Sequence, residues 1–411
     1  MERPPILLMF AIVLASLLFL REPRFQRYDE GYLRWLLRNS RPIGGAVPLT
    51  IVDISRDTAT DKQKRDAENR PATGPTSPVE FALFLQGALE FKPTVVAFEP
   101  ILQWEERNKD QEQIFVDLAM RVPKLLAAAE LTATPDLDAP VVEIPGFSQV
   151  TGRRGDLATF SGIARQPDED IRLISTLGFI NLPGDVSDEI HVPLLFNYRG
   201  EVIPSFALQA ALLWMRITPG EVKIDIGTYI YLPNGKKIPI GPDGTALINP
   251  NAARRARRLH LNELLLAAQQ HENKTPTTAH LEDLGDDIVL ARTPVDQTSS
   301  PGVFAATIAT IQSNSFVHRA SWIFDCAFIL FLVIASDFVR KFSRIDIVLM
   351  AIAITAAYCL AALGLVSRWS IWLPGILPLS ATWLVAIICF FAPRHKDDPD
   401  LPSVAASPPS L

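Results

Sequence analysis

The chain has 411 residues, which is enough for two or three ordinary domains, and its strongly apolar runs lie in the first 20 residues and after residue 319. The formal net charge is −6, and all of it falls within residues 21–319, because acidic and basic side chains balance outside that range. A mildly acidic domain repels the phosphates of nucleic acids, so the charge argues against nucleic acid as a partner.

The three cysteines, Cys326, Cys359 and Cys389, all lie in hydrophobic runs, and the large central region has none. The central region is therefore neither a disulfide scaffold nor a cysteine-liganded metal site, and a cysteine nucleophile is excluded there. The six histidines are scattered without the spacing of metal ligands. We expect no metal and no cofactor.

The N-terminal segment is apolar from residue 5 to residue 20 and follows Arg3, which is the arrangement of a signal peptide or a signal anchor. The residues directly after it do not form a cleavage site of small residues, although Ala15 provides a weak one. We therefore expect residues 1–20 to be an uncleaved transmembrane anchor, and cleavage of a signal peptide is the alternative.

Residues 21–319 are predicted to form one α/β domain that faces water and follows a juxtamembrane helix over 28–38. Apolar strand patterns alternate with helix patterns here, which predicts a mixed, largely parallel sheet with right-handed crossovers. The predicted strands are 49–54, 94–98, 124–131, 177–181, 192–196, 246–249 and 287–291. The predicted helices are 78–91, 110–121, 205–215, 259–269 and 302–312.

A hairpin is predicted over residues 223–240, because Asn234-Gly235 supplies a turn with positive φ between two apolar runs. Three polar or proline-rich segments, 61–77, 132–166 and 271–279, are predicted to be irregular loops.

A basic cluster occupies residues 254–258, with the sequence Arg-Arg-Ala-Arg-Arg. We interpret it as a solvated loop before the next helix. The alternative is that these arginines contact lipid headgroups or an acidic partner.

Three hydrophobic runs close the chain and are predicted to be transmembrane helices, at 320–338, 345–366 and 371–392. Together with the N-terminal anchor they make four membrane-spanning segments. The remaining segment, 393–411, is rich in proline, serine and alanine and is expected to be a disordered cytoplasmic tail. Too little chain follows the last helix for an output domain, so we expect none.

Basic residues indicate which side of the membrane each end occupies. Arg340, Lys341 and Arg344 fill the loop before the second of these helices, while Arg368 alone follows it. The positive-inside rule therefore places the large domain outside the cytoplasm. Arg21, Arg24 and Arg27 follow the N-terminal segment on the supposed outer side and oppose this assignment, but the rule is weakest before long translocated domains.

Two acidic residues, Asp325 and Asp337, lie within the first closing run. We interpret both as lying near lipid headgroups, and the alternative for Asp325 is a contact between helices or a proton-sensitive group. Pro374, Gly375 and Pro378 are expected to kink the last helix without ending it.

A candidate ligand site is predicted at the carboxyl ends of the strands. Asp53 and Glu99 end two strands that we expect to lie side by side, and open α/β sheets bind ligands at that edge. With Ser55, Arg292 and Asp296 they could hold a cation or a polar small molecule. The alternative is that these acids only cap helices or turns.

The signatures of common enzymes are missing. The chain has no Gly-x-Ser-x-Gly, no phosphate-binding loop and no His-Glu-x-x-His. We expect no catalytic activity and assign no catalytic residue.

The order of these elements resembles the CHASE2 family, a bacterial extracytoplasmic sensor domain that is followed by three transmembrane helices. The matching residues are Ile51-Val52-Asp53-Ile54-Ser55, Gly74-Pro75, Val95-Val96-Ala97-Phe98-Glu99, Pro204-Ser205-Phe206-Ala207, Asp286–Leu290 and Pro301-Gly302-Val303. The chain departs from the family in three places: Thr76-Ser77-Pro78 replaces a Trp-Pro-x-x-Arg sequence, Glu99 stands where Asp is usual, and a histidine after Pro-Gly-Val is missing.

The resemblance implies a sensory role in the bacterial inner membrane, as a multi-pass protein with its large domain outside the cytoplasm. Its partners would be the lipid bilayer, an extracytoplasmic ligand or protein, a separate cytoplasmic output protein, and a second copy of the chain in a homo-oligomer. The alternative function is a structural or assembly subunit of a cell-envelope complex that binds a protein and senses nothing.

Overall fold

The computed structural model describes residues 23–41, 45–54, 78–104, 108–134, 144–182, 190–276, 281, 284–293, 302–339 and 342–391. The chain divides into two compact units. Unit 1 comprises residues Met1–Leu36, Arg319–Leu365 and Trp372–Leu411, and unit 2 comprises Leu37–His318 and Val366–Ile371.

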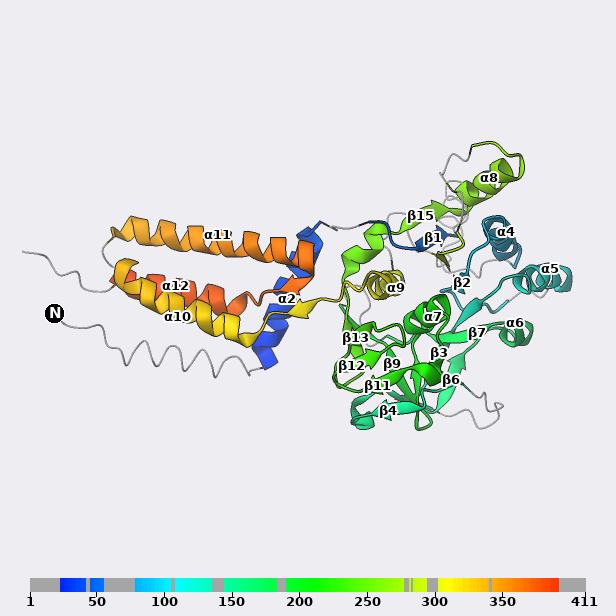
Figure 1. The fold of residues 1–411 in the computed structure, drawn as a ribbon, viewed down its shortest axis with the longest axis horizontal. Coiled ribbons are helices and arrows are strands. Elements are labelled where there is room, and N and C mark those ends of the chain that lie inside the picture. The colour runs from blue at the N-terminus through cyan, green and yellow to red at the C-terminus, as the bar shows by residue number, and fades with distance from the viewer. Residues whose placement is uncertain are drawn as a thin grey trace, which may run out of the picture. The chain divides into compact units, whose positions relative to one another are not determined.

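Unit 2 is built on a mixed, largely parallel sheet, in which the described residues contribute seven strands (Figure 1). The strand order is β15-β1-β16-β2-β3-β6, and β7 also pairs with β3. Every pairing is parallel except that of β3 with β6. The predicted α/β fold is therefore confirmed. The strands are β1 (Leu49–Asp53), β2 (Val95–Phe98), β3 (Leu125–Thr132), β6 (Gly162–Arg165), β7 (Thr176–Phe179), β15 (Arg257–His260) and β16 (Ile288–Arg292).

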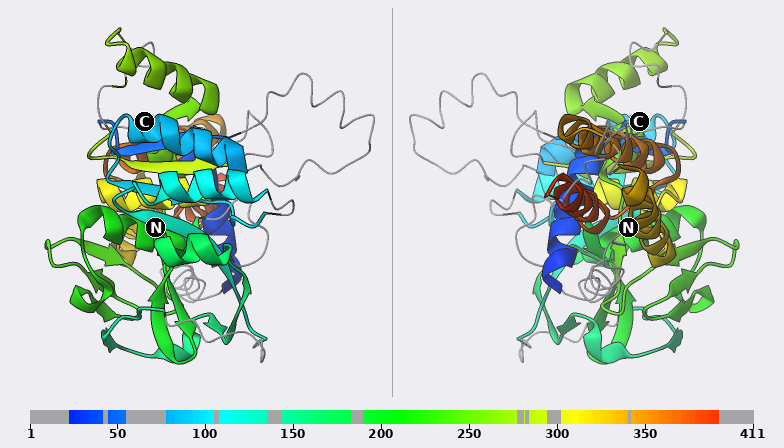
Figure 2. Two further views of the ribbon diagram at one scale, coloured as in Figure 1. Left: turned by 90° about the vertical axis from the view of Figure 1, so that its right-hand side faces the viewer. Right: turned by 90° about the vertical axis from the view of Figure 1, so that its left-hand side faces the viewer.

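Helices cover both faces of this sheet (Figures 1 and 2), and they explain why its strands are apolar throughout. One face packs against α4 (Pro78–Leu89), α5 (Lys109–Ala119) and α8 (Leu261–Glu272), and the other packs against α7 (Phe206–Met215) and α9 (Val303–Ser313). Successive residues of β1 alternate accordingly: Val52 joins the first core and Ile51 the second.

Short strands and one further α-helix complete unit 2. The hairpin predicted over 223–240 is confirmed, because β12 and β13 pair antiparallel and Gly235 in the turn has φ 82°. The loop predicted over 132–166 is wrong in part. It contains β4, β5 and β6, and β4 pairs with the distant β11, where Gln149 lies opposite Lys223. The short strands are β4 (Gln149–Thr151), β5 (Thr159–Phe160), β8 (His191–Pro193), β9 (Leu195–Tyr198), β10 (Glu201–Pro204), β11 (Lys223–Asp225), β12 (Tyr229–Tyr231), β13 (Lys237–Pro239) and β14 (Thr245–Leu247), and the further α-helix is α6 (Glu169–Ile174).

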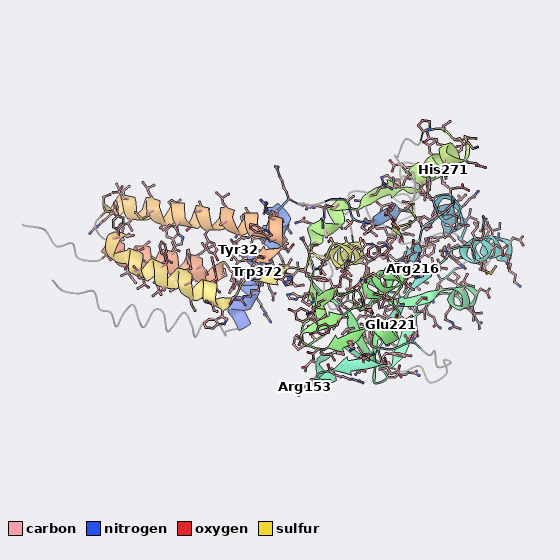
Figure 3. The ribbon with its side chains drawn as sticks, viewed as in Figure 1. Tyr32, Arg153, Arg216, Glu221, His271 and Trp372 are labelled. Atoms are coloured by element: carbon pink, nitrogen blue, oxygen red, sulfur yellow. The ribbon has the colours of Figure 1, made fainter. Side chains whose placement is uncertain are left out.

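The basic cluster is not the solvated loop that its sequence suggested. Residues Pro250–Arg255 form a short 3₁₀ helix, η4, and Arg257–His260 form β15, which pairs in parallel with β1. Helix α8 consequently begins at Leu261 and not at residue 259. The helix ends at Glu272, directly after His271, which is labelled in Figure 3. The ring centroids of His271 and Phe91 are 5.2 Å apart.

Unit 1 is helical and contains α10 (Trp322–Val339), α12 (Ile376–Phe391) and most of α2 (Pro23–Asn39) and α11 (Arg344–Trp369). Helices α10 and α12 pack through Ile329, Leu332 and Ala381. The backbone N–H groups of Gly375 and Ile376 donate to Oδ1 of Asp29, at 3.1 and 3.0 Å. Asp29 therefore caps the first turn of α12.

The last predicted helix is shorter than expected, because Ile371 and Trp372 form the extended strand β18 and the helix begins only at Ile376. Pro374 and Gly375 therefore precede the helix and do not kink it.

The expectation of four membrane-spanning helices is not supported. Among the described residues, only α11, with 26 residues, is long and apolar enough to cross a membrane. Helix α12 has 16 residues, or about 24 Å at ~1.5 Å per residue, which is less than the ~30 Å of a hydrocarbon core. The apolar stretch of α10 over Trp322–Ser336 is also too short. The predicted anchor over residues 1–20 lies outside the described residues.

Candidate functional site

The order of strands brings three polar residues to one edge of the sheet. Strands β1, β16 and β2 are parallel neighbours, so their carboxyl ends meet, and Asp53, Arg292 and Glu99 stand at those ends. In the order β15-β1-β16-β2, the chain passes from β1 to β2 in one direction across the sheet, while β15 extends the sheet from β1 in the opposite direction. This reversal of strand order is where ligands bind in open α/β sheets.

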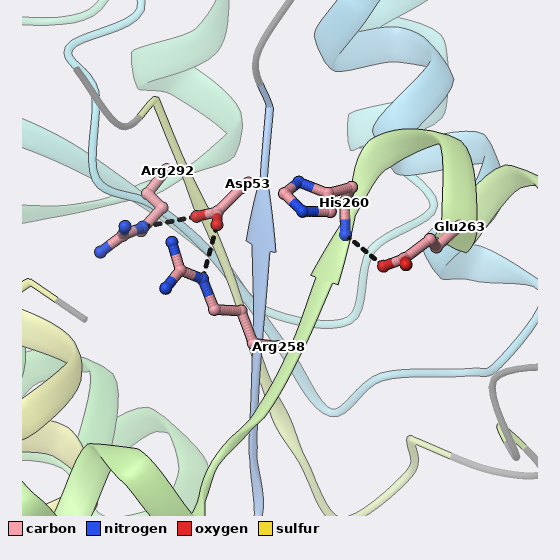
Figure 4. A network of polar contacts seen from close by, with 5 residues as sticks. All are labelled: Asp53, Arg258, His260, Glu263 and Arg292. Atoms are coloured by element: carbon pink, nitrogen blue, oxygen red, sulfur yellow. Dashed lines mark hydrogen bonds and ion pairs between the residues drawn. The ribbon is translucent and has the colours of Figure 1, made fainter. Parts of the chain in front are cut away.

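Asp53 is the centre of the cluster, and its side chain is fully buried. Nε of Arg292 donates to its Oδ1 at 2.6 Å, and Nε of Arg258 donates to its Oδ2 at 2.7 Å (Figure 4). Arg292 is itself buried, whereas the side chain of Arg258 is 31% exposed. Two charge-assisted hydrogen bonds offset the desolvation of this carboxylate.

Glu99 follows β2 directly, and its backbone N–H donates to the carbonyl of Ala291 at 3.0 Å. Its Oε2 atom is buried and has no hydrogen-bond partner within the described residues, although the residue as a whole is partly exposed. Burial raises the pKa of Glu99 to about 7; Arg292 opposes the rise and Asp53 adds to it. Near neutral pH this carboxyl therefore exists in both protonation states.

The beginning of α9 closes the cluster on one side. Gly302 precedes this helix, and a Cβ atom built on it would lie 3.3 Å from Oε1 of Glu99 and 3.6 Å from Nη1 of Arg292. The absence of a side chain at residue 302 thus allows the helix to start against these two groups. The N-terminus of a helix carries a partial positive charge, which favours negatively charged or polar groups nearby.

The structure unites three of the five predicted site residues: Asp53, Glu99 and Arg292. Ser55 and Asp296 lie outside the described residues. The interpretation of the acids as helix caps fails for Asp53, because its two oxygens accept hydrogen bonds from arginines.

The predicted site does not include Arg258, because the sequence pattern of residues 254–258 indicates a loop and not a strand that pairs with β1. The sequence signal for Arg258 is its position directly before the predicted helix that begins at residue 259. A short strand there completes one more strand–helix unit of the α/β fold.

The neighbouring His260 belongs to a helix cap and not to this cluster. Its backbone N–H donates to Oε2 of Glu263 at 2.8 Å, at the start of α8 (Figure 4).

The chemistry of the cluster favours an anionic or polar ligand over a cation. Both oxygens of Asp53 are bound by guanidinium groups and are therefore not directed at a further cation. The described part of the chain contains no group of three or more His, Cys, Asp or Glu side chains that could hold a metal ion.

The substitution Asp53→Asn removes the charge that both arginines bind, and it leaves Arg292 buried beside an uncharged amide. Breaking a buried pair in this way costs about 3–5 kcal/mol. We expect the melting temperature of unit 2 to fall by roughly 10 °C, measured by tryptophan fluorescence on the full chain. The control is Glu130→Gln, which removes a 2.6 Å ion pair with Arg165 that is largely exposed and is worth under about 1 kcal/mol. Equal shifts for the two variants would contradict the role of Asp53.

Glu99 makes stability depend on pH with a defined sign. Its ordinary pKa is 4.5 and its pKa in the folded protein is about 7, so ionisation favours the unfolded chain. The stabilising effect of the neutral form is complete below pH 4.5 and is lost as the pH rises to about 7, at a cost of about 3 kcal/mol.

We expect the melting temperature of Glu99→Gln, relative to wild type, to rise between pH 4.5 and pH 8, because glutamine stays neutral. Glu130→Gln is again the control. A difference between Glu99→Gln and wild type that does not change with pH would refute this assignment.

Comparisons of this chain with protein-family models, with curated proteins and with solved structures found no match.

Proposed function

We propose that this chain is a sensory protein of the bacterial inner membrane, in which unit 2 lies outside the cytoplasm and binds a small polar molecule at the carboxyl edge of its sheet. The observation that carries the proposal is Glu99, whose buried Oε2 atom has no hydrogen-bond partner within the described residues. A buried polar atom without a partner costs free energy, and a bound molecule would recover it.

Membrane anchoring is supported by the apolar surface of α11. Ile345, Leu349 and Leu360 are 73%, 58% and 69% exposed, and further large apolar side chains are exposed along α10 and α12. Soluble proteins rarely leave so much contiguous apolar surface in water. We infer that α11 crosses the bilayer and that α10 and α12 share its apolar environment.

The start of α11 supports the proposed orientation by its charge; the arginines of unit 2 beside the other end belong to a long domain, for which the positive-inside rule has little weight. Basic residues, including Arg344, cluster at its start, which is the cytoplasmic signature. Its other end carries Arg368 and the exposed Trp369, a residue type that is typical of the membrane–water boundary. Residues Val366–Ile371 belong to unit 2, which supports assigning this end and unit 2 to the same side of the membrane, the side that we propose to be outside the cytoplasm.

The sensory role rests on the resemblance to the CHASE2 family, and the fold is compatible with it. The matched residues Asp53 and Glu99 end β1 and β2, and Gly302 begins α9 beside Glu99. A ligand held there would bias the arrangement of α9. The signal would pass through the helices or to a separate cytoplasmic protein.

The ligand class follows from the charges. A carboxylate or phosphate group suits the two arginines and the start of α9, and a hydroxyl or amino group would supply the hydrogen bond that Oε2 of Glu99 lacks. Hydroxy acids, amino acids and sugar phosphates combine these groups.

A panel of these three compound classes should contain a ligand that raises the melting temperature of the full chain in detergent. A ligand at about one hundred times its Kd contributes about 2.7 kcal/mol. The shift should vanish in Glu99→Gln and persist in Glu130→Gln. Silence across the panel would contradict ligand sensing and favour the alternative of an assembly subunit.

The orientation can be tested with single cysteines in a variant that lacks the three native ones. Glu272→Cys lies on an exposed position of unit 2, and Ser343→Cys lies on an exposed position at the start of α11. A membrane-impermeant maleimide should label Glu272→Cys in cells whose inner membrane is intact, and Ser343→Cys only after that membrane is permeabilised. The reverse pattern would place unit 2 in the cytoplasm.

A further inference from the structure

Helix η4 is tied to the two places where unit 2 continues into the flanking helices. Nδ2 of Asn251 donates to the carbonyl of Leu37 at 2.5 Å and to Oγ of Ser40 at 2.7 Å, at the end of α2. Nδ2 of Asn249 donates to Oγ of Ser370 at 3.4 Å, just after the end of α11. All these residues belong to unit 2, so the connection is internal to it.

The same helix is also tied to the core of unit 2. The hydroxyl oxygen of Thr310 in α9 accepts a hydrogen bond from the backbone N–H of Asn249 at 3.2 Å, and the hydroxyl donates to the carbonyl of Ala306 at 2.7 Å. The side chain of Asn251 is buried. Hydrogen bonds of Asn249 and Asn251 therefore connect η4 to α9 and to the ends of α2 and α11.

Four exposed arginines lie in the segments that make these connections, and we call them the arginine collar: Arg41, Arg254, Arg257 and Arg368. The segments that carry them, 37–41, 249–258 and 366–371, contain no aspartate or glutamate. The positive charge of the collar is therefore not balanced by an acid within its own segments. Arg258 is not part of it, because it binds Asp53.

The collar lies close to the end of the helix that we propose to cross the membrane. A 3₁₀ helix rises about 2 Å per residue, so Arg254 lies within roughly 10 Å of Asn249, which binds Ser370. At the end of α11, the guanidinium of Arg368 lies over the ring of Trp369, 5.4 Å from its centre, and Trp369 is 58% exposed.

We propose that the arginine collar binds the phosphates of anionic phospholipids and so holds unit 2 against the membrane surface. The inference rests on the proposed membrane anchoring by α11. Lipid is favoured over an acidic protein because α11 ends beside the collar, and because Trp369 is a residue type that partitions to the headgroup region.

The test uses the full chain in nanodiscs of phosphatidylcholine alone or of phosphatidylcholine mixed with phosphatidylglycerol. Hydrogen–deuterium exchange is measured over residues 249–258. We expect exchange to slow in the anionic nanodiscs by about fivefold for each arginine engaged, and the effect to weaken as salt is added. The double variant Arg254→Gln, Arg257→Gln should lose most of the effect.

The matched control is Arg153→Gln, Arg154→Gln, a second pair of exposed arginines on unit 2, which should keep the lipid effect (Figure 3 labels Arg153). Equal exchange in the two lipid mixtures would overturn the proposal and leave membrane anchoring intact. Glycerol phosphate added to phosphatidylcholine nanodiscs tests a free phosphate as the ligand. If it slows exchange while phosphatidylglycerol does not, the collar binds a soluble phosphate and the proposal of lipid binding is overturned. A chain that does not enter nanodiscs at all would overturn the anchoring and the collar together.

Discussion

The carboxylate of Asp53 is the constraint on which the organisation of unit 2 depends. A fully buried charge must be paired, and its two partners come from β15 and β16, the strands on either side of β1. A shift of either neighbouring strand would leave a guanidinium or the carboxylate unpaired in the interior. We therefore infer that this cluster stabilises the register of three adjacent strands as well as their order.

The same pairing defines the electrostatics of the carboxyl edge. Burial dominates the titration of Glu99, while the charge of Arg292 lowers its pKa and the charge of Asp53 raises it. The result is one carboxylate, Asp53, that is bound by two arginines, and another carboxyl, Glu99, that can be neutral near physiological pH. Two acids at one edge of the sheet thus differ in chemistry because their partners differ.

Helix η4 and β15 link this edge to the opposite end of unit 2. Residues 249–258 hold the ends of the flanking helices through Asn249 and Asn251, and they supply the partner of Asp53 through Arg258. One short, hydrogen-bonded segment therefore connects the ends of the flanking helices to the carboxyl edge of the sheet. This is a physical route for coupling, and it needs no long chain of intermediate contacts.

Local sequence patterns specify the type of fold and most of its longer elements. Apolar strands such as β1, β2 and β16 have to be buried on both faces, and helices between them force parallel pairing, so the pattern predicts that Asp53, Glu99 and Arg292 meet. The strand order, the pairing of β4 with β11, the start of α12 and the ion pair of Arg258 with Asp53 follow only from the folded chain. These features depend on contacts between residues far apart in the chain, and no local pattern of hydrophobicity or charge specifies them.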